Sequence, residues 1–149
     1  MKSFESGLRE TDKKREISWG TGEYAWHARH QNYYLSDLGF RYAVLGRRNM
    51  DYGRACENRV YLELRRRGYD VYVGKVRDLE IDFVAMRGGE KVYIQVSDNI
   101  VAPETFGREM APFAKIRDGY PRMLIARTRN PETDFEGVRG VNLADWLRD

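Results

Sequence analysis

Hydrophobic and polar residues recur along the chain with two different periods, and each change of period predicts a new element. Over residues 54–67, apolar side chains recur every three to four positions, which predicts an amphipathic helix that ends at Gly68. Apolar and polar residues then alternate in three stretches, which predicts strands over residues 69–75, 79–86 and 91–97. The adjacent Gly88 and Gly89 favour a hairpin turn between the last two strands.

The flanking segments predict further elements. Before this block, residues 33–35 favour a short strand, and Ser36 or Asp37 can cap a helix that stops at Gly46. After it, Pro103 begins a helix that Pro112 must kink or interrupt. The continuous apolar run at 123–126 predicts a buried central strand, followed by a strand at 138–143 and a helical turn at 144–148. The order β-α-α-β-β-β-α-β-β-α favours an α/β sandwich with a mixed sheet.

The composition fits one folded domain. A chain of 149 residues, 42% of them hydrophobic, buries a core without a disulfide or a structural metal. Cys56 is the single cysteine, which is typical of the reducing cytoplasm, and no apolar run reaches the ~20 residues of a membrane helix. We therefore expect a cytoplasmic protein without a membrane partner. Residues 1–31 are expected to form a loosely structured arm and residues 32–149 the domain.

Positive charge is concentrated in one part of the chain. The net charge is +3, and residues 54–77 hold seven basic groups against three acidic ones. This excess makes DNA a candidate partner, with phosphate contacts expected from Arg54, Arg65, Arg66, Lys75 and Arg77. The alternative is that the arginines at 65–67 complement the dipole at the end of their helix and bind nothing.

A set of polar residues is predicted to meet on one face of the hairpin strands. In the first strand, alternation places four apolar residues on one face, Leu79, Ile81, Phe83 and Ala85, and Glu80 and Asp82 on the other. In the second strand, the apolar face is formed by Val92, Ile94 and Val96. Adjacent strands turn their apolar faces the same way, so Asp82, Gln95 and Ser97 are expected to share the second face.

The helix over residues 54–67 is expected to cover that polar face. Its residue Glu57 lies on the same helical stripe as three apolar residues, Val60, Tyr61 and Leu64. From the helix alone, the ordinary explanation is that Glu57 lies at the edge of the stripe and pairs with Arg54 or Arg59. Next to the polar strand residues, Glu57 becomes a candidate site residue.

This arrangement resembles the active-site scaffold of the PD-(D/E)XK, or restriction-endonuclease-like, superfamily. The resemblance rests on Glu57 in a helix, on Glu80-Ile81-Asp82-Phe83-Val84 in a strand, and on the hairpin into Gln95-Val96-Ser97. Tyr33-Tyr34-Leu35-Ser36-Asp37-Leu38-Gly39 and the segment from Glu57 to Lys75 resemble one branch of it, the uncharacterised C-terminal domain found behind AAA-type ATPase modules in archaea and bacteria. The resemblance covers residues 32–149 and implies a sandwich with a mixed central β-sheet flanked by helices.

The resemblance also implies a role for each position. Asp82 matches the metal-binding aspartate and Glu57 the helical glutamate, whereas Gln95 and Ser97 stand where the family has an acidic residue and a lysine. The Val96 carbonyl would assist in holding Mg²⁺. Gln95 lacks a unit charge, worth on the order of 4 kcal/mol at about 4 Å, and Ser97 supplies no cation. We therefore expect Mg²⁺ to bind weakly or not at all, with Glu80 and Lys75 as candidate substitutes for the lost carboxylate and lysine.

Three functions follow as hypotheses. The first is a nuclease-fold accessory domain with a degenerate active site that binds nucleic acid or a partner protein, together with an AAA ATPase. The second is an active Mg²⁺-dependent DNA endonuclease, and the third is a module for protein interaction alone. The chain has no G-x-x-x-x-G-K-[ST] motif, so we expect any ATPase to be a separate module. The neutral residues at positions 95 and 97 favour the first hypothesis over the second.

Overall fold

The computed structural model describes residues 51–129 and 134–149. These residues form helices α2 (Tyr52–Arg66), α3 (Pro103–Met110) and α4 (Leu143–Trp146), and a 3-10 turn, η1 (Phe113–Lys115). The strands are β1 (Asp70–Val76), β2 (Leu79–Arg87), β3 (Glu90–Ser97), β4 (Arg122–Ala126), β5 (Asp134–Phe135) and β6 (Val138–Asn142). The elements predicted for residues 1–50, including the N-terminal arm, lie outside the described residues.

The described strands form one six-stranded sheet in the order β1-β2-β3-β4-β6-β5. Strands β1, β2 and β3 are antiparallel neighbours, whereas β4 and β6 run parallel to β3, and β5 is antiparallel to β6. The sheet is therefore mixed, and the α/β class predicted from the sequence is confirmed. Pro112 interrupts the third predicted helix as expected, because α3 ends at Met110 and η1 begins at Phe113.

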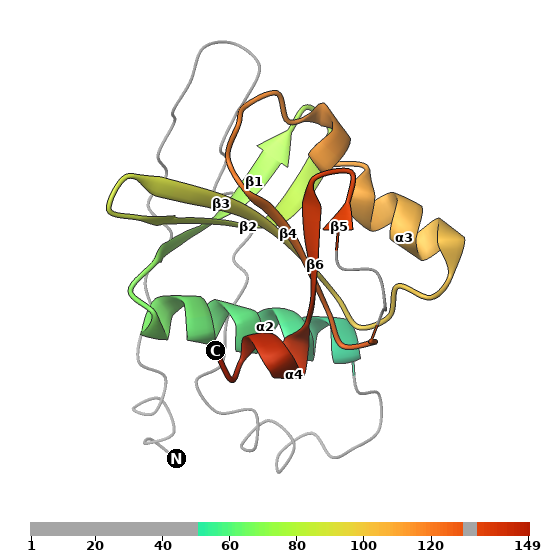
Figure 1. Ribbon diagram of the computed structural model, residues 1–149, viewed down its shortest axis with the longest axis horizontal. Coiled ribbons are helices and arrows are strands. Elements are labelled where there is room, and N and C mark those ends of the chain that lie inside the picture. Colours follow the sequence, from blue (N-terminus) through green and yellow to red (C-terminus); the bar gives the residue numbers. More distant parts are fainter. Residues whose placement is uncertain (1–50, 130–133) are drawn as a thin grey trace, which may run out of the picture.

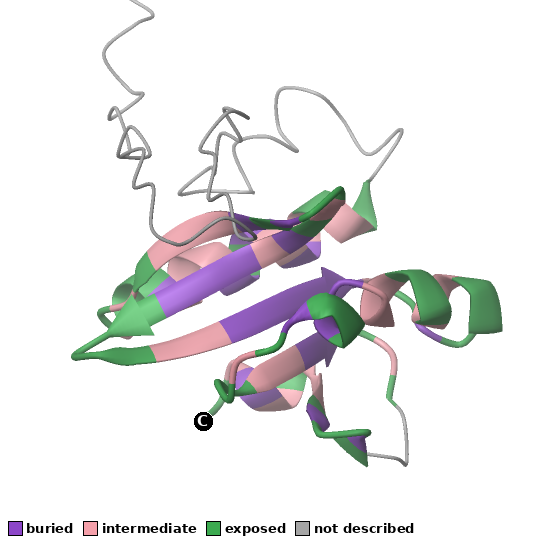
Figure 2. Ribbon diagram, turned by 90° about the horizontal axis from the view of Figure 1, so that it is seen from above, coloured by how far each residue is buried: buried purple, intermediate pink, exposed green. Residues whose placement is uncertain are grey.

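Helices cover both faces of this sheet. Figure 1 shows α2 and α4 together on one face and α3 on the other. The core on the α2 side is formed by buried residues of the two helices and the sheet, including Val60, Leu64, Phe83, Ile94 and Trp146. The core on the α3 side includes Ile81, Tyr93, Phe113, Leu124 and Phe135, with Phe106 and Met110 of α3 packed against it. Burial is concentrated in the central strands, and α3 has an exposed outer side (Figure 2).

Local sequence explains where α2 begins and ends. The side chain of Asp51 accepts a hydrogen bond from the backbone N–H of Arg54 at 3.1 Å, which caps the first turn. At the other end, Gly68 adopts a φ of 82°, and its N–H donates to the carbonyl of Arg65 at 3.0 Å. A left-handed glycine at this position closes the helix and turns the chain into β1. In the described residues, no helix has the length and apolar character needed to cross a membrane.

The predicted faces of β2 are wrong in its first half. Ile81 packs in the core on the α3 side, whereas Phe83 and Ala85 pack in the core on the α2 side. The cause is a shift of register against β1, where Tyr72 pairs with Val84 but Gly74 pairs with Ile81. One extra residue of β2 is accommodated between these pairs, and this bulge reverses the alternation of faces at Asp82.

Candidate functional site

Strands β2 and β3 part at Asp82 and Gln95. Their paired residues run from Arg87 and Glu90 at the hairpin to Phe83 and Ile94, and the ladder stops there. Beyond this point side chains replace the backbone pairing. The N–H of Asp82 donates to Gln95 Oε1 at 2.7 Å, and the N–H of Val96 donates to Asp82 Oδ2 at 2.8 Å. We call this point, formed by Asp82, Gln95 and the backbone of Val96, the fork.

The β-bulge explains why the fork lies at Asp82. The extra residue in β2 falls between Ile81 and Val84, so the backbone of Asp82 leaves the regular ladder on both sides. A buried N–H that loses its ladder partner must find another acceptor, and the Gln95 amide supplies it. The structure therefore brings Asp82 and Gln95 together, as the sequence predicts.

A third polar side chain reaches the fork from α3. The Gln95 amide nitrogen donates to Glu109 Oε2 at 3.3 Å, and the Glu109 side chain is 13% exposed. Sequence reasoning missed Glu109. Its signal was the helical spacing, because Glu109 follows Phe106 by three residues and so lies near the inward face of α3.

Carboxylates dominate the electrostatics of the fork. Burial raises the pKa of Asp82 to about 7, against the hydrogen bond from Val96, and the charges of Glu57, Glu109 and Glu80 raise it further. Burial also raises the pKa of Glu57, with contributions from Asp51 and Glu109 that Arg54 partly offsets. Glu57, Asp82 and Glu109 come from α2, β2 and α3, and their charges are close enough to oppose one another.

The structure corrects which helix covers the polar face of β3. Val92, Ile94 and Val96 pack in the core on the α2 side, so the helix that carries Glu57 covers the apolar face of β3. Gln95 points to the opposite face and contacts α3 through Glu109. The prediction that the helix of Glu57 covers Gln95 and Ser97 is therefore wrong. The apolar stripe of α2 requires an apolar partner, and the polar side of β3 does not provide one.

The remaining candidate site residues take no part in the hydrogen bonds that define the fork. Ser97 is buried, and its hydroxyl donates to the carbonyl of Asn99 at 3.2 Å, so it shapes the turn that follows β3. Lys75 and Glu80 are exposed and face each other as partners across β1 and β2. Cys56 is buried in the core on the α2 side, and burial raises the pKa of its thiol, which fits a core residue better than a nucleophile.

The arrangement does not fit the Mg²⁺ site that the resemblance implies. Among the residues that the structure describes, no three His, Cys, Asp or Glu side chains lie close enough together to hold a metal ion. One oxygen of Asp82 and the amide oxygen of Gln95 already accept backbone N–H groups. These bonds use one lone pair of each oxygen and fix its direction for the fold.

Much of the predicted phosphate-binding surface is occupied by contacts within the protein. Arg66 binds both oxygens of Glu63 at 2.7 and 2.6 Å, and Arg65 binds Asp70 at 3.2 Å. Arg67 binds Glu63 at 2.6 Å and the carbonyl of Trp146 at 2.6 Å, with its guanidinium 4.4 Å from the centre of the Trp146 ring. We call Glu63, Arg66 and Arg67 the arginine clasp, because it fastens the end of α2 to α4.

The other cations predicted to bind phosphate do not gather around Arg65 and Arg66. Arg54 lies at the opposite end of α2 and pairs with Asp51 at 3.3 Å. Arg77 follows the end of β1, whereas Arg65 binds Asp70 at its start, and the seven residues of β1 separate them by about 20 Å. The five predicted contacts therefore do not form one compact patch.

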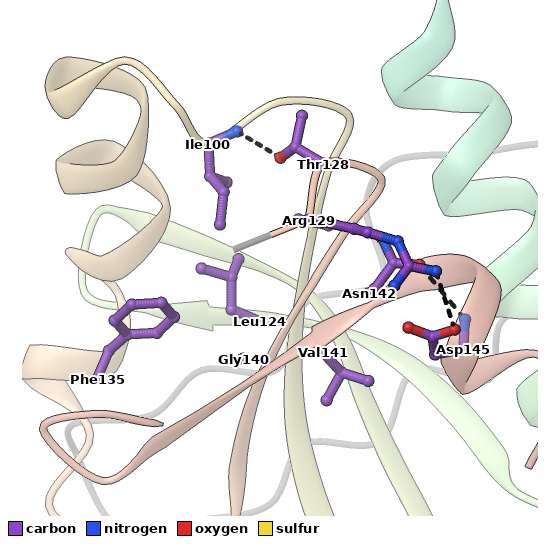
Figure 3. Close-up of a pocket in the computed structure, with 10 residues that line it drawn as sticks. Ile100, Leu124, Thr128, Arg129, Phe135, Gly140, Val141, Asn142 and Asp145 are labelled. Carbon is purple, nitrogen blue, oxygen red and sulfur yellow. Dashed lines mark hydrogen bonds and ion pairs between the residues drawn. The ribbon is translucent and has the colours of Figure 1, made fainter. Parts of the chain in front are cut away.

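A separate pocket of about 140 Å³ lies at the carboxyl ends of β4 and β6. Figure 3 shows Leu124, Phe135 and Ile100 around its apolar part and Arg129 and Asp145 at its rim. Arg129 and Asp145 pair with each other at 3.5 Å, and Thr128 accepts the N–H of Ile100 at 3.3 Å. The pocket shares no lining residue with the fork.

Comparison with known proteins places the chain beside one longer protein. No family model matches the chain, and no solved structure matches it. Over 115 residues the chain is 36% identical to an uncharacterised protein of Haemophilus influenzae. The aligned segment is 77% of this chain and 28% of that protein, so the chain spans little more than a quarter of the length of its relative.

Proposed function

We propose that this chain is an accessory domain with a restriction-endonuclease-like fold and a degenerate active site, which binds nucleic acid or a partner protein alongside an AAA-type ATPase. The resemblance of residues 32–149 to the domain behind such ATPases supports the association. The greater length of the Haemophilus influenzae relative agrees with a domain that works within a larger protein.

One observation carries the proposal, namely that the polar groups of the fork bind one another. Gln95 accepts from Asp82 and donates to Glu109, and Asp82 accepts from Val96. A site that activates water on a metal needs ligand oxygens free to coordinate and a cation near the attacking water. At the fork, one oxygen of Asp82 and the amide oxygen of Gln95 each hold a backbone N–H, and the charges that most affect Asp82 are carboxylates rather than a cation.

Incubation with supercoiled plasmid tests this proposal. The wild-type chain is expected to leave the plasmid intact with Mg²⁺ and to cleave it little with Mn²⁺. Asp82→Ala is the matched control, because it removes the central carboxylate of the fork. Robust cleavage by the wild type that disappears in Asp82→Ala would overturn the proposal.

A second candidate, an active Mg²⁺-dependent endonuclease, is favoured by the mutual repulsion at the fork. Glu57 and Glu109 raise the pKa of Asp82, and a divalent cation bound by Asp82 would offset that repulsion. Glu109→Gln separates the two candidates. It should abolish cleavage if Glu109 takes the place of the missing carboxylate, and it should change nothing in an accessory domain.

A third candidate, a module for protein interaction alone, is favoured by the arginine clasp. Arg66 and Arg67 bind Glu63, so part of their positive charge is already neutralised within the protein. This candidate predicts that neither single-stranded nor duplex DNA binds, even at low ionic strength.

A further inference from the structure

A cationic surface lies on the loop between η1 and β4. This loop and the neighbouring strand β3 carry four basic residues, Lys91, Lys115, Arg117 and Arg122. Among residues 115–122 the one acidic side chain is Asp118, so the five charged groups sum to +3. Figure 1 shows the loop, in orange, on the side of the molecule away from α2 and α4. We call Lys91 and residues 115–122 the cationic loop.

Hydrogen bonds within the protein hold the cationic loop in place. Asp118 Oδ2 accepts from the buried Tyr93 hydroxyl at 2.6 Å and from Lys91 Nζ at 2.9 Å. Burial raises the pKa of Asp118, but these two bonds, the backbone N–H of Tyr120 and the charge of Lys91 together lower it below its ordinary value. Arg122 donates to the carbonyls of Ile116 and Asp118, both at 3.2 Å, so backbone oxygens hold its guanidinium in place. The loop is therefore a formed surface with its carboxylate turned inward.

An aromatic ring stands among these cations. Tyr120 is 43% exposed, and Lys91 Nζ lies 4.2 Å from the centre of its ring. Lys115 and Arg117 on the same loop are exposed. A large aromatic side chain that remains half in water amid positive charge is typical of surfaces that stack a base beside a phosphate backbone.

The cationic loop and the fork lie on the same face of β3. Lys91, Tyr93 and Gln95 alternate with the residues that pack against α2, so all three point toward the α3 side. Gln95 lies four positions after Lys91, about 13 Å along the strand, and Tyr93 between them is buried.

We propose that the cationic loop binds single-stranded nucleic acid, with Lys115 and Arg117 contacting phosphates and Tyr120 stacking on a base. This inference rests on the nucleic-acid branch of the proposed function and names its surface. It places the contacts on the α3 side of the sheet, away from Arg65 and Arg66. A single strand is favoured over a duplex because its unpaired bases can reach the Tyr120 ring.

Fluorescence anisotropy tests the proposal with a labelled oligo(dT) of about 20 nucleotides, longer than the footprint of most single-strand binding surfaces. The logarithm of the affinity should fall linearly with the logarithm of the salt concentration, with a slope near −1.4 for the two phosphate contacts. The double variant Lys115→Glu/Arg117→Glu should bind at least about tenfold more weakly and should lose most of that slope. Arg54→Glu/Arg65→Glu, which changes the net charge equally on the other surface, should behave like the wild type.

Tyr120 provides a second, independent measurement. Tyr120→Ala should weaken binding on the order of tenfold with an unchanged salt slope, and Tyr120→Phe should keep the affinity, because the ring and not the hydroxyl makes the contact. Thermal unfolding of every variant establishes that a loss of binding is not a loss of fold.

The outcomes separate this inference from the proposed function. If binding is lost in Arg54→Glu/Arg65→Glu and kept in Lys115→Glu/Arg117→Glu, the cationic loop is excluded and the accessory nucleic-acid function stands. If duplex binds more tightly than single strand and Tyr120→Ala has no effect, the stacking role is overturned. If the wild type binds neither probe at low salt, both the inference and the nucleic-acid branch of the proposed function fall.

Discussion

The fork and the arginine clasp are both clusters of charged side chains, yet their electrostatics are opposite. In the clasp, Glu63 receives three hydrogen bonds from Arg66 and Arg67, and the bonds from Arg66 are the main cause that lowers the pKa of Glu63 to about 2. At the fork, burial and the carboxylates of Glu57 and Glu109 raise the pKa of Asp82 to about 7.

This contrast distinguishes a carboxylate that stabilises the fold, Glu63, from one that destabilises it, Asp82. Each carboxylate of a structural cluster is expected to gain an opposite charge on folding, as Glu63 does in joining α2 to α4. A buried carboxylate that gains only like charges lowers stability, and such positions are concentrated at functional sites. The fork therefore has the electrostatic character of an active site, although its hydrogen bonds are those of a structural junction.

The largest expected effect tests the charge of Asp82. Its folded-state pKa of about 7 lies above the ordinary value of 3.8, so between these values the folded chain holds a proton that the unfolded chain has lost. Stability must then fall as the pH rises through this window and level off above it. Asp82→Asn removes the titration and keeps an acceptor for the Val96 N–H. The wild type should therefore lose about 3 kcal/mol of unfolding free energy relative to this variant as the pH rises from 5 to 8.

Urea denaturation across this pH range measures the loss. Asp82→Ala is the control, because it loses the charge and the acceptor together. Its unfolding free energy should depend on pH as that of Asp82→Asn does, but should be about 1 kcal/mol lower at every pH because the hydrogen bond is lost. A difference between wild type and Asp82→Asn that does not change with pH would mean that Asp82 is ionised in both states, and the contrast between fork and clasp would disappear.

The second effect concerns the clasp. Arg67 is 22% exposed and binds both Glu63 and the carbonyl of Trp146, whereas Arg66 is 70% exposed and binds Glu63 alone. Arg67→Ala should therefore cost about 2–3 kcal/mol in the free energy of unfolding, through the lost charged hydrogen bonds and the contact with the Trp146 ring. Arg66→Ala should cost much less than Arg67→Ala, because exposed ion pairs contribute little. Equal losses in the two variants would show that the clasp does not fasten α4.

The sequence predicts the regular parts of this fold and misses the irregularity that forms the site. The helix over residues 54–67 and the three following strands repeat one period each, and the structure has them within a few residues as α2, β1, β2 and β3. The bulge at Asp82 depends on how β2 pairs with β1, which no period within β2 records. One inserted residue reversed the face of Ile81. The wrong prediction of which helix covers the fork has another cause, because the apolar face of β3 packs against α2 and its polar face therefore points toward α3.

Partners of charged residues were equally hard to predict. The sequence pairs Asp82 with Gln95 through strand parity, but it does not show that Glu109 on α3 completes the network. The sequence also predicts Arg65 and Arg66 as phosphate ligands. It does not show that Arg65 binds Asp70 at the start of β1, because the contacts of long side chains depend on tertiary neighbours. Composition locates charge along the chain, and only the fold decides which charges remain available.

A third test lowers the pH to weaken the clasp. The folded-state pKa of Glu63, about 2, lies below its ordinary value of 4.5, so its stabilising contribution is fully present above about pH 4.5 and is lost as the pH falls toward 2. Between pH 6 and pH 3 the wild type should lose about 1 kcal/mol more than Glu63→Gln, a figure that allows for solvent screening of Arg66. Chemical denaturation at the two pH values measures it. If the wild type and Glu63→Gln lose the same unfolding free energy, other carboxylates cause the loss of stability in acid.

The smallest expected effect tests whether a single substitution can make the fork bind a metal ion. Gln95→Glu adds a carboxylate beside Asp82 and removes the amide that donates to Glu109. Without metal, the extra negative charge should destabilise the chain. With millimolar Mn²⁺, the midpoint of thermal unfolding of this variant should rise by about 2–4 °C, which corresponds to about 1 kcal/mol of binding free energy in a chain of this size. The double variant Asp82→Asn/Gln95→Glu is the control and should lose the rise, and the wild type should show none. An equal rise in the wild type would mean that the fork already binds the metal, and the endonuclease hypothesis would then replace that of a degenerate site.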